Sequence, residues 1–295
     1  MDSGLPTFFI LGAGRSGTTS LAGHLRRHPA VFIPEIKEPS FFASSWQWVS
    51  DPAKYVDLYA DAGEVSQLGD ASHLYLEDPA SPRILRAFFP DARFILMFRN
   101  PADRALALYS QMLEWGYELQ PTFEDGLAAE DDRFHSERFR KNCPHSFWNF
   151  MYFRSGLFGE QVERYLELWP RDRFYATTMY EYLAQPARVT ADICEFLAIE
   201  TVDLGEVPHY GSSKGTRSRH AQYVERRLLR PLMRRDVPGA ATARDRLLAW
   251  NRQAERPRMQ PGTRDALVGR FAPDLERLNQ LLGVDVLASE REFSS

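Results

Sequence analysis

The feature that most constrains the fold is a short apolar run that ends in a glycine-rich loop and leads into a helical pattern. Residues 8–11 (Phe-Phe-Ile-Leu) precede the loop 12–19 (Gly-Ala-Gly-Arg-Ser-Gly-Thr-Thr), and Leu21 and Leu25 follow at helical spacing. A strand, a tight loop and a helix in this order direct backbone N–H groups and the positive helix end toward one point, which favours an anion. We therefore expect this loop to bind a phosphate-like group.

Further apolar runs predict the rest of the core. The runs 94–98 and 174–177 are strand candidates, and helical stretches at about 82–89 and 158–169 precede them. Pro101 is well placed for the first turn of another helix. Strands that alternate with helices are typical of a parallel, doubly wound sheet. The sequence thus predicts an α/β fold with a central parallel sheet flanked by helices.

The organisation of the chain favours one domain. No internal repeat or Gly/Ser/Pro-rich linker separates two halves. We expect a single domain over residues 1–295 with a core at about 8–287. The pattern weakens at about 115–155, which we interpret as a surface insertion on the acceptor side. Acidic residues interrupt this stretch and predict a solvated face: Glu124, Asp125, Glu130, Asp131 and Asp132.

Composition excludes several classes of protein. The formal net charge of -4 argues against a general nucleic-acid binder, which needs a basic surface. Cys143 and Cys194 lack the spacing of a zinc site or a disulfide framework, so we expect no metal and a reducing compartment. The N-terminus has no cationic n-region, and its apolar run is too short to span a membrane. These features predict a cytoplasmic protein without a membrane span, and they do not indicate its oligomeric state.

The loop differs from the nucleotide-binding loops that it partly matches. Thr18 stands where the P-loop of nucleotide hydrolases has its phosphate-binding lysine, which disfavours an ATP-dependent phosphotransferase. The spacing Gly-x-Gly-x-x-Gly is present, but no well-placed acidic residue ends a second strand as in dinucleotide-binding folds. Arg15 and three hydroxyls add hydrogen-bond donors that a simple turn does not need.

The same loop resembles the 5′-phosphosulfate loop of sulfotransferases that use 3′-phosphoadenosine 5′-phosphosulfate (PAPS). Further segments match in family order: Lys37-Glu38-Pro39-Ser40-Phe41-Phe42, residues 69–75, Arg99-Asn100-Pro101, Tyr180-Glu181 and Lys214-Gly215-Thr216-Arg217. The resemblance runs from about residue 8 to residue 287. It implies a P-loop fold related to nucleotide kinases, and an enzyme that moves a sulfuryl group from PAPS to a hydroxyl, or less readily an amine, and releases PAP.

The resemblance also implies a donor site with two anion-binding ends. The 5′ end is formed by Arg15, Ser16, Gly17, Thr18, Thr19 and Ser20. The 3′-phosphate is bound by Arg99. A second loop closes over this phosphate and consists of Lys214, Gly215, Thr216 and Arg217. Tyr180 matches a tyrosine beside the purine, although a core tyrosine explains it equally well.

Two alternatives stay open at the 3′ end. The family usually has a serine eight residues after its arginine, where this chain has Ala107; Ser110, one helical turn later, can replace it, or Arg99 and the basic loop suffice. Arg99 can instead form a salt bridge at the sheet edge. Most of the arginines in 226–235 are explained by a solvated helix face.

For catalysis, the resemblance implies an electrostatic role for Arg15, whose fixed charge would stabilise the bridging oxygen as sulfur departs. An acceptor hydroxyl also needs a general base. Glu38 lies where glycan-type members have a glutamate base, and His73 lies in a context similar to that of the catalytic histidine of small-molecule members. We favour Glu38 as the base. The alternative for Glu38 is a surface carboxylate paired with Lys37, and the alternative for His73 is a core imidazole.

The acceptor is predicted only by class. The Lys-Glu-Pro-x-Phe-Phe match favours a carbohydrate or glycosylated metabolite. Its pocket is expected in segments 40–60 and 115–155, where the pattern is weak and aromatic residues cluster: Trp46, Trp48, Tyr117, Trp148 and Tyr152. These aromatic side chains can stack on sugar rings, but core packing explains them about as well. Apart from the phosphotransferase, the alternative is a non-catalytic nucleotide-phosphate binding protein.

Overall fold

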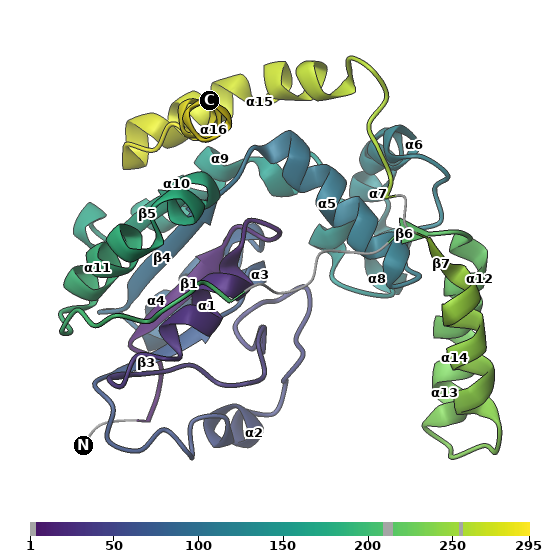
Figure 1. Cartoon of the computed structure of the whole chain (residues 1–295), viewed down its shortest axis with the longest axis horizontal. Helices are drawn as coiled ribbons and strands as arrows, with labels where there is room; N and C mark the ends of the chain where they lie inside the picture. The colour runs from purple at the N-terminus through teal and green to yellow at the C-terminus, as the bar shows by residue number, and fades with distance from the viewer. Residues whose placement is uncertain (1–3, 209–214, 254–255) are drawn as a thin grey trace. The chain divides into compact units, whose positions relative to one another are not determined.

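The computed structural model describes residues 4–208, 215–253 and 256–295 (Figure 1). The chain divides into two compact units. Unit 1 comprises Met1–Pro101, Gly156–Tyr210 and Arg270–Ser295; unit 2 comprises Ala102–Ser155 and Gly211–Gly269. The expectation of one domain over the whole chain stays a prediction.

Unit 1 is built on a five-stranded parallel sheet with the order β2-β3-β1-β4-β5. Its strands are β1 (Phe8–Gly12), β2 (Val31–Phe32), β3 (Gln67–Ala71), β4 (Arg93–Phe98) and β5 (Phe174–Thr178). The α/β prediction is confirmed, and so are the three predicted strands. Because β1 lies at the centre, its carboxyl end carries the glycine-rich loop to the middle of the sheet edge.

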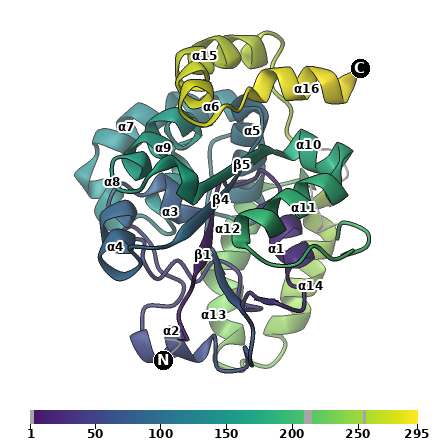
Figure 2. The same cartoon turned by 90° about the vertical axis from the view of Figure 1, so that its left-hand side faces the viewer.

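Helices cover both faces of this sheet (Figure 2). Successive residues of β1 point to opposite faces. Phe8 and Ile10 join a core cluster with side chains of α1 and α11. Phe9, on the other face, lies 6.1 Å from Tyr75 of α3 and 5.0 Å from Phe89 after α4, between ring centroids. The helices of unit 1 are α1 (Thr18–Leu25), α2 (Pro52–Asp57), α3 (Leu74–Glu77), α4 (Ser81–Phe88), α9 (Phe158–Leu166), α10 (Met179–Ala184), α11 (Pro186–Leu197) and α16 (Val286–Ser294), with short 3₁₀ turns Arg154–Gly156, which begins in unit 2, and Arg171–Arg173.

Unit 2 consists of helices and one small ladder. Two long helices extend across the unit boundaries: α5 (Pro101–Glu114), which begins at the proline as predicted, and α15 (Thr263–Leu282). The other elements are α6 (Phe123–Ala128), α7 (Glu130–His135), α8 (Glu137–Asn142), the 3₁₀ turn Phe147–Phe150, α12 (Arg219–Val224), the π-helical turn Glu225–Leu229, α13 (Arg230–Met233), α14 (Ala240–Asn251), and the antiparallel strands β6 (Gly215–Thr216) and β7 (Arg252–Gln253).

The predicted solvated acidic face is only partly present. Asp125, Asp131 and Asp132 are exposed. Glu130 is buried, and its carboxylate accepts hydrogen bonds from the backbone N–H groups of Phe153 (2.7 Å) and Arg154 (2.9 Å). The prediction was wrong for Glu130, because this side chain satisfies backbone donors rather than water.

The state of the cysteines and the length and hydropathy of the helices bear on the expected location of the protein. Cys143 and Cys194 are free thiols. Among the helices of the described residues, none is both long and apolar enough to cross a membrane.

Candidate active site

The glycine-rich loop joins the carboxyl end of β1 to α1 in unit 1. The backbone N–H of Ala13 donates to the carbonyl of Met97 in β4 (2.8 Å), which fastens the loop to the sheet. Gly17 precedes α1 with φ 93°, a left-handed conformation that favours glycine. The amides at the start of a helix have no intrahelical acceptor, so those of Thr18 and Thr19 suit an anion.

The polar side chains of the loop differ in exposure. Ser16 is fully buried, and its Oγ has no hydrogen-bond partner among the described residues. Thr18 is buried, Thr19 is exposed, and Arg15 and Ser20 are half-buried. A buried hydroxyl usually has a partner, so Ser16 indicates a ligand group that this loop would receive.

Both candidate bases lie beside this loop and pair with each other. A carboxylate oxygen of Glu38 (Oε2) forms an ion pair with His73 Nδ1, and the other oxygen (Oε1) accepts from Lys37 Nζ. Glu38 follows the edge strand β2, whereas His73 follows β3, so parallel neighbouring strands deliver both residues to the same sheet edge. The sequence predicted either residue as the base but not their pairing.

The pairing shifts both protonation equilibria. Burial opposes ionisation of Glu38, but the charges of His73 and Lys37 and the hydrogen bonds that both donate outweigh it and lower the pKa of Glu38. Burial also opposes ionisation of His73, but the charges of Glu38 and Glu77 outweigh it and raise the pKa of His73. Both shifts therefore favour a carboxylate beside an imidazolium.

Glu77 is a member of the site that sequence reasoning missed. It lies one helical turn after His73, at the end of α3, and is 2% exposed. A signal was available, because the spacing i, i+4 brings two side chains together on a helix. Its negative charge favours the protonated form of His73.

Gly14 shows how closely the phosphate loop approaches these residues. A Cβ atom at Gly14 would lie 2.7 Å from His73 Cδ2 and 3.2 Å from Glu77 Oε1. No side chain fits between the loop and the histidine. The glycine therefore permits contact between the anion-binding loop and the acid–base residues.

The substitution Gly14→Ala is expected to push His73 away from the loop. We expect it to lower the free energy of unfolding by about 1–3 kcal/mol, as overpacking does, and to reduce turnover because His73, the ion-pair partner of Glu38, moves. Denaturant unfolding and kinetics measure both. Gly269→Ala, where an added Cβ meets nothing within 4 Å, is the control; Gly14→Ala with unchanged stability and turnover would contradict the contact.

Asp70, for which no catalytic role is predicted, belongs to a buried network behind the site. Its carboxylate accepts hydrogen bonds from the hydroxyls of Tyr55, Tyr75 and Ser72, each at 2.8 Å. Burial raises the pKa of Asp70 to about 6. These contacts fix the β3 end that carries His73.

Arg99 follows β4 at the same sheet edge. It is half-buried, and its Nε has no hydrogen-bond partner among the described residues. Within the described part of the chain, no ion pair of Arg99 supports the salt-bridge alternative. Its guanidinium is thus suited to an anion from outside the protein.

Tyr180 lies next to this arginine but is packed as a core residue. It is 6% exposed, and its hydroxyl accepts from the backbone N–H of Asn100 (3.2 Å) and donates to Glu290 in α16 (3.1 Å). Burial raises the pKa of Tyr180 to about 12. Its contact with a purine stays a prediction.

Ser110 and the C-terminal loop belong to unit 2. Ser110 Oγ donates to the carbonyl of Leu106 in the same helix (2.8 Å). Lys214 lies outside the described residues. Gly215 and Thr216 form β6, and Arg217 lies 5.4 Å over the ring of Trp250.

A cavity of about 230 Å³ lies within unit 2 at the described part of this loop. Its lining includes Gly215, Thr216, Arg230, Arg244 and Arg252. Arg230 and Arg244 pair with the buried Glu225, so a solvated face alone does not explain Arg230.

The aromatic residues proposed for an acceptor pocket do not form one group. Trp46 and Trp48 belong to unit 1, and the other three belong to unit 2. Tyr152 is fully buried and donates to Glu118 (2.6 Å), which favours the core explanation for it.

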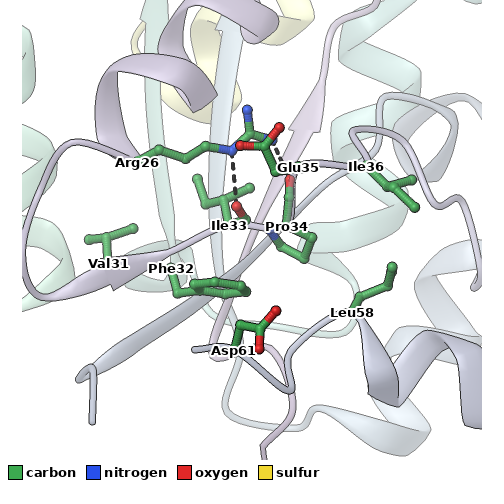
Figure 3. A pocket seen from close by; sticks show the side chains of 9 residues that line it. All are labelled: Arg26, Val31, Phe32, Ile33, Pro34, Glu35, Ile36, Leu58 and Asp61. Carbon is green, nitrogen blue, oxygen red and sulfur yellow. Dashed lines mark hydrogen bonds between the residues drawn. The ribbon is translucent and has the colours of Figure 1, made fainter. Parts of the chain in front are cut away.

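Unit 1 instead has a cavity of about 440 Å³ along β2 and the segment that leads to Lys37 (Figure 3). Arg26 crosses its wall and donates to the carbonyls of Ile33 (2.9 Å) and Pro34. Figure 3 shows apolar side chains with the carboxylates of Glu35 and Asp61.

No group of three or more His, Cys, Asp or Glu side chains that could hold a metal occurs among the described residues. The geometry is that of an anion-binding loop in contact with a carboxylate–imidazolium pair. This arrangement suits transfer of an anionic group to an acceptor whose proton must be removed.

Comparisons with known proteins agree with this chemistry. A family model described as "Sulfotransferase domain" matches residues 5–223. Human heparan sulfate glucosamine 3-O-sulfotransferase 6 is 24% identical over 214 residues, which cover 71% of this chain and 57% of that protein. Human bifunctional heparan sulfate N-deacetylase/N-sulfotransferase 2 is 28% identical over 206 residues, covering 66% of this chain and 22% of that protein. The chain thus spans less than two thirds of the length of these relatives.

A solved structure supports the same assignment over the whole chain. The crystal structure of a sulfotransferase from Alicyclobacillus acidocaldarius matches with a TM-score of 0.72 and 26% identity, covering 97% of this chain and 99% of that one. The family match, the parallel sheet and the phosphate loop agree with the resemblance found in the sequence. The chain therefore belongs to the sulfotransferase family.

Proposed function

We propose that this enzyme transfers the sulfuryl group of PAPS to a hydroxyl of an acceptor and releases PAP. The observation that carries the proposal is the contact at Gly14, where the phosphate loop meets His73, which in turn pairs with Glu38. Donor loop and acid–base pair lie in one unit and within contact distance.

The residues present fit PAPS as the donor substrate. The donor has an anionic phosphosulfate at one end and a 3′-phosphate at the other. Ser16 Oγ and Arg99 Nε are buried polar atoms without partners among the described residues, and they follow β1 and β4, which are neighbours in the sheet. Two separate anion-binding positions support a nucleotide that carries anionic groups at both its 5′ and its 3′ position.

The reaction forms a bond between the acceptor oxygen and sulfur and breaks the bond between sulfur and the bridging oxygen. The electron pair of the broken bond stays on the 5′-phosphate of PAP. Arg15 stabilises that growing charge, as cationic groups do in phosphoryl transfer. The acceptor proton passes to Glu38.

Glu38 suits the role of base better than His73. The raised pKa of His73 favours its protonated form, in which the imidazole has no free lone pair for a proton. Glu38 stays ionised. Although a carboxylate with a lowered pKa is a weak base, the acceptor oxygen becomes strongly acidic as its bond to sulfur forms, and a weak base is then sufficient. Lys37 and His73 hold the carboxylate in place.

The proposed acceptor is a carbohydrate or glycosylated metabolite. Relatives named for heparan sulfate modification support this class. The 440 Å³ cavity has the size of a small-molecule site, and its lining includes Ile36, the residue before Lys37. The free thiols support a cytoplasmic location.

The pKa shifts predict an alkaline decline in activity. Glu38 remains ionised down to a pH below its ordinary pKa of 4.5, whereas His73 loses its proton only above its ordinary pKa of 6.5. We expect kcat/KM to fall as the pH rises through the raised pKa of His73, because the loss of its charge releases Glu38. In His73→Gln the profile should be flat in this range and lower throughout; a wild-type alkaline limb that persists in His73→Gln would contradict the assignment.

The free energy of unfolding should also depend on pH through these two pKa shifts. The stabilisation that involves His73 is complete below 6.5 and is lost as the pH rises through its folded pKa; that of Glu38 is present above 4.5 and is lost as the pH falls through its folded pKa.

Transfer of radioactive sulfur from labelled PAPS to a panel of sugars and glycosides tests the proposal. Labelled product without added magnesium supports it. Turnover of ATP with magnesium and none of PAPS would favour the phosphotransferase, and PAP binding without transfer would favour a non-catalytic binding protein.

A further inference from the structure

The most unusual surface lies in unit 2, on the helical hairpin of residues 219–251, which we call the arginine hairpin. It consists of α12, the π-helical turn, α13 and α14. It contains eight arginines and three acidic residues, a formal charge of +5 in a chain whose net charge is -4.

The hairpin is held together by polar contacts on its inner side. Glu225 is fully buried and accepts from Arg230 Nε (2.9 Å) and Arg244 Nε (2.7 Å). Asn251, also buried, donates to Gln222 (2.9 Å). The contacts of Arg244 and Asn251 join α14 to the preceding helical segment.

The outer side carries the large apolar residues instead. Exposed fractions are 40% for Val224, 56% for Leu228 and 37% for Leu232, which are spaced four residues apart and so share one side of a helix. Val237 (40%) and Trp250 (52%) are also exposed. Exposed arginines accompany them: Arg227, Arg234, Arg235 and Arg246.

We propose that the arginine hairpin docks on an anionic phospholipid surface. Leucines and a tryptophan on a helical segment rich in arginine are the composition of interfacial helices, in which apolar side chains enter the acyl boundary and cations contact headgroups. The cytoplasmic leaflet carries the complementary negative charge. Large apolar side chains exposed next to exposed arginines match a surface that is apolar below and anionic at its boundary.

The composition of the hairpin argues against two other partners for this surface, a second copy of the chain and a polysaccharide polyanion. A second copy would bring the same positive surface against itself in a two-fold interface, with like charges opposed. A polysaccharide polyanion would satisfy the arginines but leave the leucines in water. The inference does not rest on the proposed transfer reaction.

Vesicle sedimentation of the full chain tests the inference. Vesicles of phosphatidylcholine alone are compared with equimolar phosphatidylcholine and phosphatidylglycerol. Binding is expected only to the anionic vesicles, with a blue shift of tryptophan emission that Trp250→Phe reduces.

Two pairs of substitutions separate the contributions. Arg234→Glu with Arg235→Glu should weaken vesicle binding by at least about thirtyfold, because each charge at an anionic leaflet contributes about fivefold. Leu228→Ser with Leu232→Ser, which leaves the charge unchanged, should weaken it at least about tenfold. The matched control is Val56→Ser with Phe88→Ser in unit 1, at side chains that are 50% and 66% exposed; it should bind like the wild type.

Each other outcome overturns the inference. If heparin competes and the leucine pair binds normally, the surface is a polyanion site. If light scattering shows a dimer that the leucine pair dissolves, the occupant is a second copy. No binding to anionic vesicles by the wild type also overturns it. Circular dichroism of each variant shows whether it is folded.

Discussion

Glu38→Gln is expected to lower kcat by about 10²- to 10⁴-fold, the range for loss of a general base, and to leave the affinity for PAP unchanged. The amide keeps the shape of the side chain but cannot accept the acceptor proton. The carboxylate of Glu38 pairs with Lys37 and His73, which lie outside the phosphate loop, so the donor site should survive. Steady-state transfer kinetics and PAP titration measure the two effects separately.

The exposed carboxylate of Glu64 provides a control for this substitution. Glu64→Gln should behave like the wild type. Full turnover by Glu38→Gln together with inactive His73→Gln would transfer the role of base to His73. Full turnover by both variants would contradict an acid–base role for the pair.

Arg15→Ala should lower kcat by about 10²- to 10³-fold, the effect of removing one donor that stabilises developing charge. The guanidinium is permanently charged, and the growing negative charge lies on the oxygen between sulfur and phosphorus. We expect a smaller effect on PAP affinity than on kcat, because PAP already carries the charge but lacks the sulfur undergoing transfer. Kinetics and titration on the same preparation test this difference.

Arg15→Lys and Arg83→Ala are the controls for Arg15→Ala. The lysine variant should recover part of kcat, since it restores a positive charge without the fixed planar fork. Arg83 is an exposed arginine of α4 and should be neutral. Equal losses in kcat and in PAP affinity for Arg15→Ala would contradict a role specific to the transition state.

The predicted strands are those with a strong local signal. Residues 94–98 form a continuous apolar run because β4 is buried on both faces of a parallel sheet. β3 was missed because its sequence, Gln-Leu-Gly-Asp-Ala, includes a buried aspartate that is stabilised by hydroxyls distant in sequence. β2 has only two residues, too few for a periodic pattern.

The candidate site shows the same limit. Motif context pointed to Glu38 and His73, but nothing local indicates that they pair, because the contact depends on the order of β2 and β3 in the sheet. Likewise, the buried carboxylate of Glu225 follows from a tertiary contact, its ion pair with Arg244 of α14. Residue types could be predicted from the sequence, whereas their partners required the fold.

Calorimetric titration with PAP, beside ATP and AMP and with or without magnesium, tests the central claim most directly. The phosphate loop has no lysine at Thr18, and Arg99 is available for a second phosphate, so PAP should bind tightly without magnesium and AMP weakly. Clear binding of ATP with no binding of PAP would contradict a PAPS-dependent sulfotransferase.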